Sequence, residues 1–137
     1  MVSDPDCLFC RIVAGDIPSS RVFEDERTVA FMDINPATRG HLLVVPRAHA
    51  RDLLVAAPED LAACAHTAQR LAGLASERLG AAGVNLLTSS GAAAWQTVFH
   101  LHFHVIPRYE GDPLRLPWVP ASGDPDEITA TAALLTE

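Results

Sequence analysis

The chain has 137 residues, of which 49% are hydrophobic and 20% are charged, and its formal net charge is −7. This length predicts one domain, and the hydrophobic share is enough for one compact core. The acidic balance argues against a surface that coats nucleic acid, but it does not exclude a single nucleotide held by local groups. No apolar run approaches a membrane span, and the first residues lack the segments of a secretory signal. We therefore expect a cytoplasmic protein without nucleic-acid or membrane partners.

The first part of the chain predicts a short helix and three strands. Asp6 is the expected N-cap of a helix over residues 7–14. Strands over residues 21–24 and 28–33, joined by a tight turn, are expected to form a hairpin. A third strand, largely buried, follows over residues 41–46.

One long helix is predicted over residues 58–79. Pro58 suits its first position, and Gly80 suits the position after its last residue. Apolar residues recur at helical spacing along it and form one stripe that we expect to pack on the sheet. The members of this stripe are Leu61, Ala65, Ala68, Leu71, Ala72, Ala75 and Leu79.

Beyond the long helix the sequence predicts two more strands, over residues 83–89 and 99–108. A tail rich in proline and glycine then leads to a short helix that Asp124 caps. These elements predict an α+β fold, with an antiparallel sheet of about five strands, one long helix and short terminal helices. All 137 residues are assigned to one domain, with residues 1–110 as its core and residues 111–137 as the tail.

Three histidines alternate with apolar residues in the last predicted strand. Because successive side chains of a strand point to opposite faces, we expect His100, His102 and His104 to share one face. An exposed sheet face can carry polar residues of any kind. Three imidazoles with a common target could also attack an electrophile, relay protons or bind a metal.

The segment from Gln96 to Ile106, Gln-Thr-Val-Phe-His-Leu-His-Phe-His-Val-Ile, resembles the signature of the histidine triad (HIT) family. The segments Asp33-Ile34, Gly40-His41 and Val44 to His49 also resemble family motifs, in the same order and at similar intervals. The resemblance covers residues 7–108 and is strongest to the Hint-like bacterial branch. It implies the HIT fold and a homodimer.

The resemblance implies a nucleotide hydrolase or transferase that acts at the α-phosphate. His102 is the implied nucleophile, which forms a nucleotidyl-histidine intermediate, and His104 and His41 are implied to act on the same phosphate. A neutral imidazole nitrogen is a competent nucleophile near pH 7, which agrees with this role. The expected reaction releases a purine nucleoside monophosphate from a phosphoramidate or a related nucleotidyl compound.

Other functions stay open at this point. A dinucleoside polyphosphate hydrolase or a nucleotidyl transferase would use the same nucleophile on a different substrate. A nucleotide-sensing protein without significant turnover would keep the fold and lose the reaction, and a plain zinc-binding module would bind no nucleotide at all.

The resemblance also implies a nucleotide-binding set, in which the Asp33 carboxylate accepts hydrogen bonds from the ribose hydroxyls. Without the family, Asp33 could equally be a turn former, and the apolar members of the set fit a hydrophobic core better than a pocket. The set is Leu8, Phe9, Ile12, Phe31, Asp33, Ile34, Ser89, Gln96, Thr97 and Val98. Ser89 and Trp95 depart from the Asn and Gly of many relatives, which would alter the leaving groups that fit.

Cys7 and Cys10 form a C-x-x-C pair whose thiolates can reach one ion. Similarity to bacterial relatives implies that His49 and His100 complete a zinc site. Its role would be structural, because four protein ligands leave no open position for a substrate. A redox pair is disfavoured because no thioredoxin-like strand precedes it, and a zinc ribbon would need a second C-x-x-C. Cys64 is expected to be a small buried residue.

Overall fold

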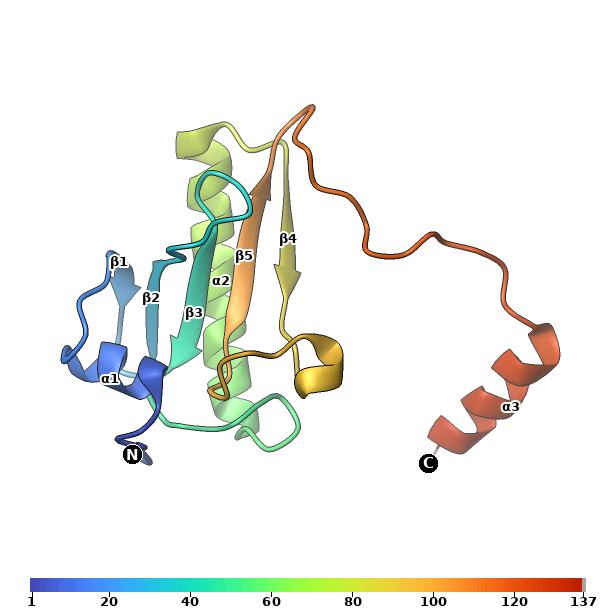
Figure 1. The fold of residues 1–137 in the computed structure, drawn as a ribbon, viewed down its shortest axis with the longest axis horizontal. Helices are drawn as coiled ribbons and strands as arrows, with labels where there is room; N and C mark the ends of the chain where they lie inside the picture. Colours follow the sequence, from blue (N-terminus) through green and yellow to red (C-terminus); the bar gives the residue numbers. More distant parts are fainter. Residues whose placement is uncertain (137) are drawn as a thin grey trace.

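The computed structural model describes residues 1–136 and contains one five-stranded antiparallel sheet in the order β1-β2-β3-β5-β4 (Figure 1). The strands are β1 (Arg21–Glu24), β2 (Thr28–Met32), β3 (Leu42–Pro46), β4 (Gly83–Leu87) and β5 (Phe103–Arg108). The helices are α1 (Leu8–Ala14), α2 (Pro58–Leu79), the short 3₁₀ turn η1 (Ala92–Ala94) and α3 (Pro125–Leu135). The predicted α+β fold with a five-stranded sheet is confirmed.

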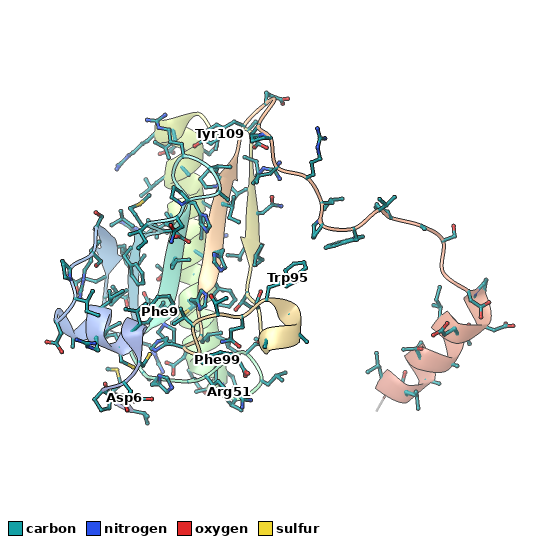
Figure 2. The ribbon with its side chains drawn as sticks, viewed as in Figure 1. Asp6, Phe9, Arg51, Trp95, Phe99 and Tyr109 are labelled. Atoms are coloured by element: carbon teal, nitrogen blue, oxygen red, sulfur yellow. The ribbon has the colours of Figure 1, made fainter. Side chains whose placement is uncertain are left out.

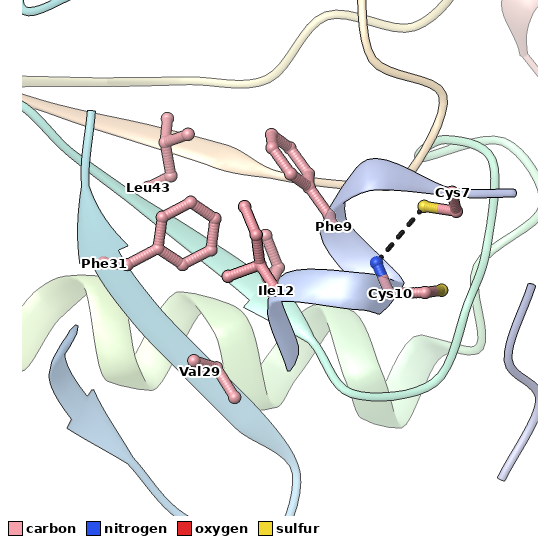
Figure 3. Packing of buried hydrophobic residues seen from close by; sticks show 8 residues of the cluster. Cys7, Phe9, Cys10, Ile12, Val29, Phe31 and Leu43 are labelled. Carbon is pink, nitrogen blue, oxygen red and sulfur yellow. Dashed lines mark hydrogen bonds between the residues drawn. The ribbon is translucent and has the colours of Figure 1, made fainter. Parts of the chain in front are cut away.

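The two faces of the sheet carry different hydrophobic clusters, because side chains alternate along each strand. The face toward α1 takes Val29, Phe31, Leu43 and Val45 from β2 and β3, together with Phe9 and Ile12 of α1 (Figure 3). The face toward α2 takes Ala30, Leu42, Val44 and Val105, together with Cys64, Ala68 and Leu71 of α2. The short helix α1 covers β2 and β3, whereas α2 packs on β2, β3, β4 and β5. Part of the α1 face therefore stays open beside β5.

The N-cap of α1 is Cys7, so the prediction of Asp6 is wrong. The Cys7 sulfur accepts a hydrogen bond from the Cys10 N–H at 3.3 Å, as Figure 3 shows. Asp6 lies in a turn before the helix, where its N–H donates to the side chain of Asp4. Gly15 ends the helix with φ of 85°, a left-handed conformation that suits glycine.

The bounds of α2 are those that the sequence predicts, but its buried stripe is shifted. Ala65 is exposed, whereas Cys64 and Thr67, which the predicted stripe leaves out, are buried. The Thr67 hydroxyl lies 2.8 Å from the hydroxyl of Thr28, and this pairing makes a polar residue acceptable in the core. The burial of Cys64 is confirmed.

The histidine strand begins at Phe103, four residues later than predicted. Before Phe103 the chain is held by isolated hydrogen bonds and not by a strand ladder. The Leu101 N–H donates to the Ala50 carbonyl, and the Thr88 hydroxyl donates to the His102 carbonyl, each at 2.7 Å. Of the three histidines only His104 lies in a strand. It pairs with Leu43 and so lies on the α1 face of the sheet.

The tail leaves the body after β5, and α3 stands apart on the far side of the edge strand β4 (Figure 1). Asp124 caps α3, as predicted, by accepting from the Glu127 N–H. No residue of α3 is buried. Within residues 1–136, no helix is both long enough and apolar enough to cross a membrane.

Candidate active site and metal cluster

A cavity of about 410 Å³ opens between α1 and the open part of the sheet beside β5. Its size is within the range of small-molecule sites. Most of the residues that the sequence predicts for nucleotide binding and catalysis line it. They are Leu8, Phe9, Ile12, Phe31, Asp33, Ile34, Thr97, Val98, His102 and His104.

His102 presents one free ring nitrogen to this cavity. Its Nδ1 lies 2.7 Å from the His100 carbonyl, which can only accept, so Nδ1 carries the proton and Nε2 keeps its lone pair. The ring of Phe9 packs against the imidazole with centroids 5.0 Å apart and planes at 88°. Burial lowers the pKa of His102, which keeps the ring neutral. The result is an oriented, unprotonated nitrogen that can attack an electrophile.

A second chain of hydrogen bonds gives His104 the opposite tautomer. The Ala37 N–H donates to Nδ1 of His41 at 2.9 Å, so a neutral His41 carries its proton on Nε2. That nitrogen lies 2.9 Å from Nδ1 of His104, which must accept. His104 therefore carries its proton on Nε2. The cavity wall thus combines an acceptor nitrogen on His102 with an N–H donor on His104.

Asp33 has both of the roles that the sequence leaves open. Its Oδ1 accepts from the Asn35 N–H at 2.8 Å and forms a turn. Its Oδ2 lies 3.4 Å from Nε2 of His41, and the side chain also lines the cavity. The negative charge of Asp33 favours the protonated forms of His41, His102 and His104 and so opposes the effect of burial on their pKa values.

Gln96 and Ser89 do not line this cavity. Gln96 is buried, and its side-chain amide bonds to the backbone of Gly91, Arg51 and Val98, which fixes the loop before the histidines. Ser89 lines a separate hollow of about 790 Å³ beside Trp95. Their roles in nucleotide binding stay predictions.

Trp95 adopts φ of 74°, which is rare for a residue other than glycine, and 70% of its surface is exposed. Figure 2 shows it on the loop between β4 and β5. Backbone strain of this kind gathers at functional sites. Glycine adopts this conformation without strain, so the tryptophan at this position adds backbone strain to the loop.

Several residues of the cavity were not predicted. They come from the turn after α1 and from the strand ends, and they are Ile17, Pro18, Ser19, Met32, Asn35 and Leu43. The Ile17-Pro18 chain break is the only signal in the sequence that could have pointed to the first three, because a loop that follows a lining helix often continues the wall. The Ala37 N–H, which sets the tautomer of His41, carries no sequence signal at all.

Cys7, Cys10, His49 and His100 converge on one point, as the sequence predicts. Their ligand atoms all lie within 4.8 Å of one another. Nδ1 of His100 lies 3.4 Å from the Cys7 sulfur, 3.5 Å from the Cys10 sulfur and 3.3 Å from Nδ1 of His49. The His100 Nε2–H donates to the Pro46 carbonyl at 2.9 Å, so Nδ1 faces the cluster with its lone pair. The cluster could bind a metal ion.

The family model described as the HIT domain matches residues 14–111. The chain belongs to the HIT family. It is 40% identical over 114 residues to "Protein hit" of Bacillus subtilis (strain 168), which covers 82% of this chain and 79% of that protein. It is also 37% identical over 107 residues to adenylylsulfatase HINT3 of Arabidopsis thaliana, covering 78% of this chain and 54% of that protein.

Solved structures of proteins similar in sequence share this fold. SMU.412c from Streptococcus mutans UA159 matches with a TM-score of 0.91 and 39% identity, over 97% of this chain and 85% of that one. A Zn-bound histidine triad family protein from Mycobacterium smegmatis matches with a TM-score of 0.78 and 44% identity, over 95% of each chain.

The stability of the protein should depend on pH through its buried histidines. Burial, together with the neighbouring His102 and His41, lowers the pKa of His104 to about 4. An unfolded histidine has a pKa of about 6.5, so between these two pKa values the unfolded chain binds more protons than the folded one. We expect the free energy of unfolding to fall as the pH drops from about 6.5 to about 4.

Urea denaturation at a series of pH values would measure this decrease. His66→Gln is the matched control because His66 is exposed on α2, and the decrease should survive this substitution. A free energy of unfolding that rises over the same acid range would contradict the prediction.

Proposed function

We propose that this protein is a nucleotide hydrolase that acts at the α-phosphate of nucleoside phosphoramidates or related nucleotidyl compounds and releases a nucleoside monophosphate. The observation that carries the proposal is the pair of opposite tautomers, an unprotonated nitrogen on His102 beside an N–H donor on His104. Membership of the HIT family supports a nucleotide hydrolase or transferase in general, and adenylylsulfatase HINT3 is a relative whose name describes an enzyme.

In the proposed reaction, Nε2 of His102 attacks the α-phosphorus and forms a P–N bond while the bond to the leaving group breaks and the leaving group takes up a proton from the solvent. The ring then carries a positive charge, which the His100 carbonyl and the nearby Asp33 carboxylate stabilise. His104 donates its Nε2–H to a phosphoryl oxygen, where negative charge develops. Water then attacks the phosphorus and gives up a proton to the solvent, which cleaves the P–N bond, releases the monophosphate and restores the neutral imidazole.

The nucleoside would occupy the apolar part of the cavity. Phe9, Ile12 and Phe31 give it a hydrophobic wall that suits a purine base, and Asp33 at its edge can accept from ribose hydroxyls. Ile34 is 91% exposed and would contact a ligand only at the rim.

We further propose that the metal cluster holds a structural zinc ion. A tetrahedral zinc site with N and S ligands has N···N edges of about 3.3 Å and S···N edges of about 3.5 Å. The separations of 3.3, 3.4 and 3.5 Å between the ligand atoms of the cluster agree with such a tetrahedron. The Cys7 sulfur accepts the Cys10 N–H, and the Cys10 sulfur accepts the Asp4 N–H, which suits thiolate ligands. A bound ion would cross-link α1 to the segments that adjoin β3 and β5 of the sheet.

We also propose a homodimer formed through β4. This strand is at the edge of the sheet, where its free backbone groups can pair with another strand. Its residues Leu86 and Leu87 are 51% and 41% exposed. Two copies joined antiparallel along β4 would continue the sheet and cover these side chains.

Replacement of the nucleophile should abolish turnover. For His102→Ala we expect the release of nucleoside monophosphate to fall by about a thousandfold or more, since a covalent nucleophile is removed. The assay uses a panel of adenosine and guanosine phosphoramidates and dinucleoside polyphosphates, and the preferred leaving group would separate the hydrolase types. His66→Ala should retain wild-type turnover. If the wild-type protein binds nucleotides but turns none of them over, the hydrolase proposal is wrong and the nucleotide-sensing function takes its place.

Zinc should purify with the protein at about one ion per chain. Cys10→Ala should lose the ion, measured by atomic emission, and should unfold at a lower temperature. Cys64→Ala is the matched control, because Cys64 is buried but lies outside the cluster. The site would be disproved if the protein carries no zinc and its melting temperature does not change when zinc or a chelator is added.

The dimer should depend on β4. Leu86→Glu places a charge on the edge strand, and we expect it to convert the dimer to a monomer in sedimentation analysis. Val2→Glu alters an exposed apolar residue near the N-terminus and should leave the dimer intact. A wild-type protein that sediments as a monomer at high concentration would refute the dimer.

A further inference from the structure

The C-terminal helix α3 is amphipathic, and none of its residues is buried against another part of residues 1–136. Ile128, Ala132 and Leu135 follow one another at helical spacing and share one side of it. Ile128 is 59% exposed and Leu135 is 81% exposed. Isolated helices of this length are marginal in water, because most helical stability in proteins comes from packing of an apolar side. This side of α3 therefore needs a surface to pack on.

An apolar groove of about 470 Å³ lies on the opposite face of the sheet from the candidate active site. It runs between the C-terminal half of α2 and the strands β1 to β3, and Val22, Met32 and Leu74 are among its lining residues. Arg39 and Arg78 also line it. Within residues 1–136 neither arginine takes part in an ion pair. The groove thus combines apolar residues with two uncompensated positive charges.

The charges of α3 complement this groove. Asp124 and Glu127 flank the apolar side at the start of the helix, and the helix contains no basic residue. With Ile128 and Leu135 turned into the groove, these carboxylates can lie near Arg39 and Arg78. Attraction between opposite charges would fix the direction of the helix and help to exclude other orientations.

The start of the tail is directed away from the groove of its own chain. Arg108 binds both oxygens of Asp112, with distances of 2.8 and 2.7 Å, and donates to the Leu114 carbonyl. This bidentate pair turns the chain at Gly111, and Figure 1 shows the tail running past β4 into the space beyond the sheet edge. A second copy joined at β4 would occupy that space.

The tail is long enough to reach the groove of a second copy. Fully extended, the roughly 16 residues between β5 and α3 span about 55 Å. Strands in a sheet lie about 4.8 Å apart, so β2 of a second sheet joined at β4 lies about 25 Å from β5 across the strands. The tail therefore covers this distance even with bends at its prolines.

We propose that α3 of one protomer docks in the groove between α2 and β1 to β3 of a second copy of this chain, with Ile128 and Leu135 inward and its carboxylates facing Arg39 and Arg78. The exchange is reciprocal, so each copy gives one helix and accepts one. This proposal rests on the homodimer proposed above and adds a second contact to it.

The absence of lysine from the chain allows a sharp test. Arg78→Lys in the full-length protein places one side-chain amine in the groove, and a zero-length carbodiimide would join it to a carboxylate of α3. We expect a covalent dimer on a denaturing gel, with the link mapped by mass spectrometry to Asp124 or Glu127. Arg11→Lys on α1 is the matched control and should give no such product.

A second substitution in the Arg78→Lys background tests the apolar contact. Ile128→Glu should lower the cross-linked fraction at least about tenfold, whereas Ala130→Glu on the opposite side of α3 should leave it unchanged. A link within one chain would contradict docking on a second copy. A dimer in sedimentation that gives no cross-link would overturn the docking of α3 and leave the dimer through β4 standing, whereas a monomer would overturn both.

Discussion

His100 connects the metal cluster with the candidate active site. Its Nδ1 faces the cluster, its Nε2–H donates to the Pro46 carbonyl, and its own carbonyl accepts from Nδ1 of His102. A shift of this one residue would therefore move both a ligand atom and the acceptor that sets the tautomer of His102. Because the ring of His100 is fully buried and held at both nitrogens, the orientation of the His102 imidazole depends on it.

The metal cluster also determines the position of α1, which forms the apolar wall of the cavity. Cys7 and Cys10 lie at the start of α1, and Phe9 between them packs on Phe31 and on His102, with centroid distances of 5.5 and 5.0 Å (Figure 3). A helix of seven residues buries too little to hold its own position. Anchoring α1 through its two sulfurs would therefore fix the apolar wall and the imidazole together, and a metal ion bound in the cluster would supply that anchor beside the candidate site.

Much of the fold could be predicted from periodicity and end signals. The limits of α2 follow from Pro58 and Gly80, and the hairpin follows from its turn, since local physical chemistry determines both. The errors arise where tertiary contacts decide. Asp6 is an acceptable cap, but the chain places Cys7 at the N-cap, where its sulfur accepts the Cys10 N–H. Thr67 can be buried because Thr28 offers it a hydroxyl.

The residues of the candidate site could be predicted from the sequence, but the ring nitrogens that carry the protons could not. Spacing places His102 and His104 near each other, and family resemblance gives each a role. Only the positions of backbone groups from distant segments, the His100 carbonyl and the Ala37 N–H, determine that one imidazole offers a lone pair and the other an N–H. A backbone carbonyl is present in every residue and an N–H in every residue except proline, so no sequence pattern reveals which of them will bond to the histidines. The chemistry of the pair is thus a property of the fold, and a change in the loop around Ala37 could reverse the tautomer of His104 without any change in a histidine.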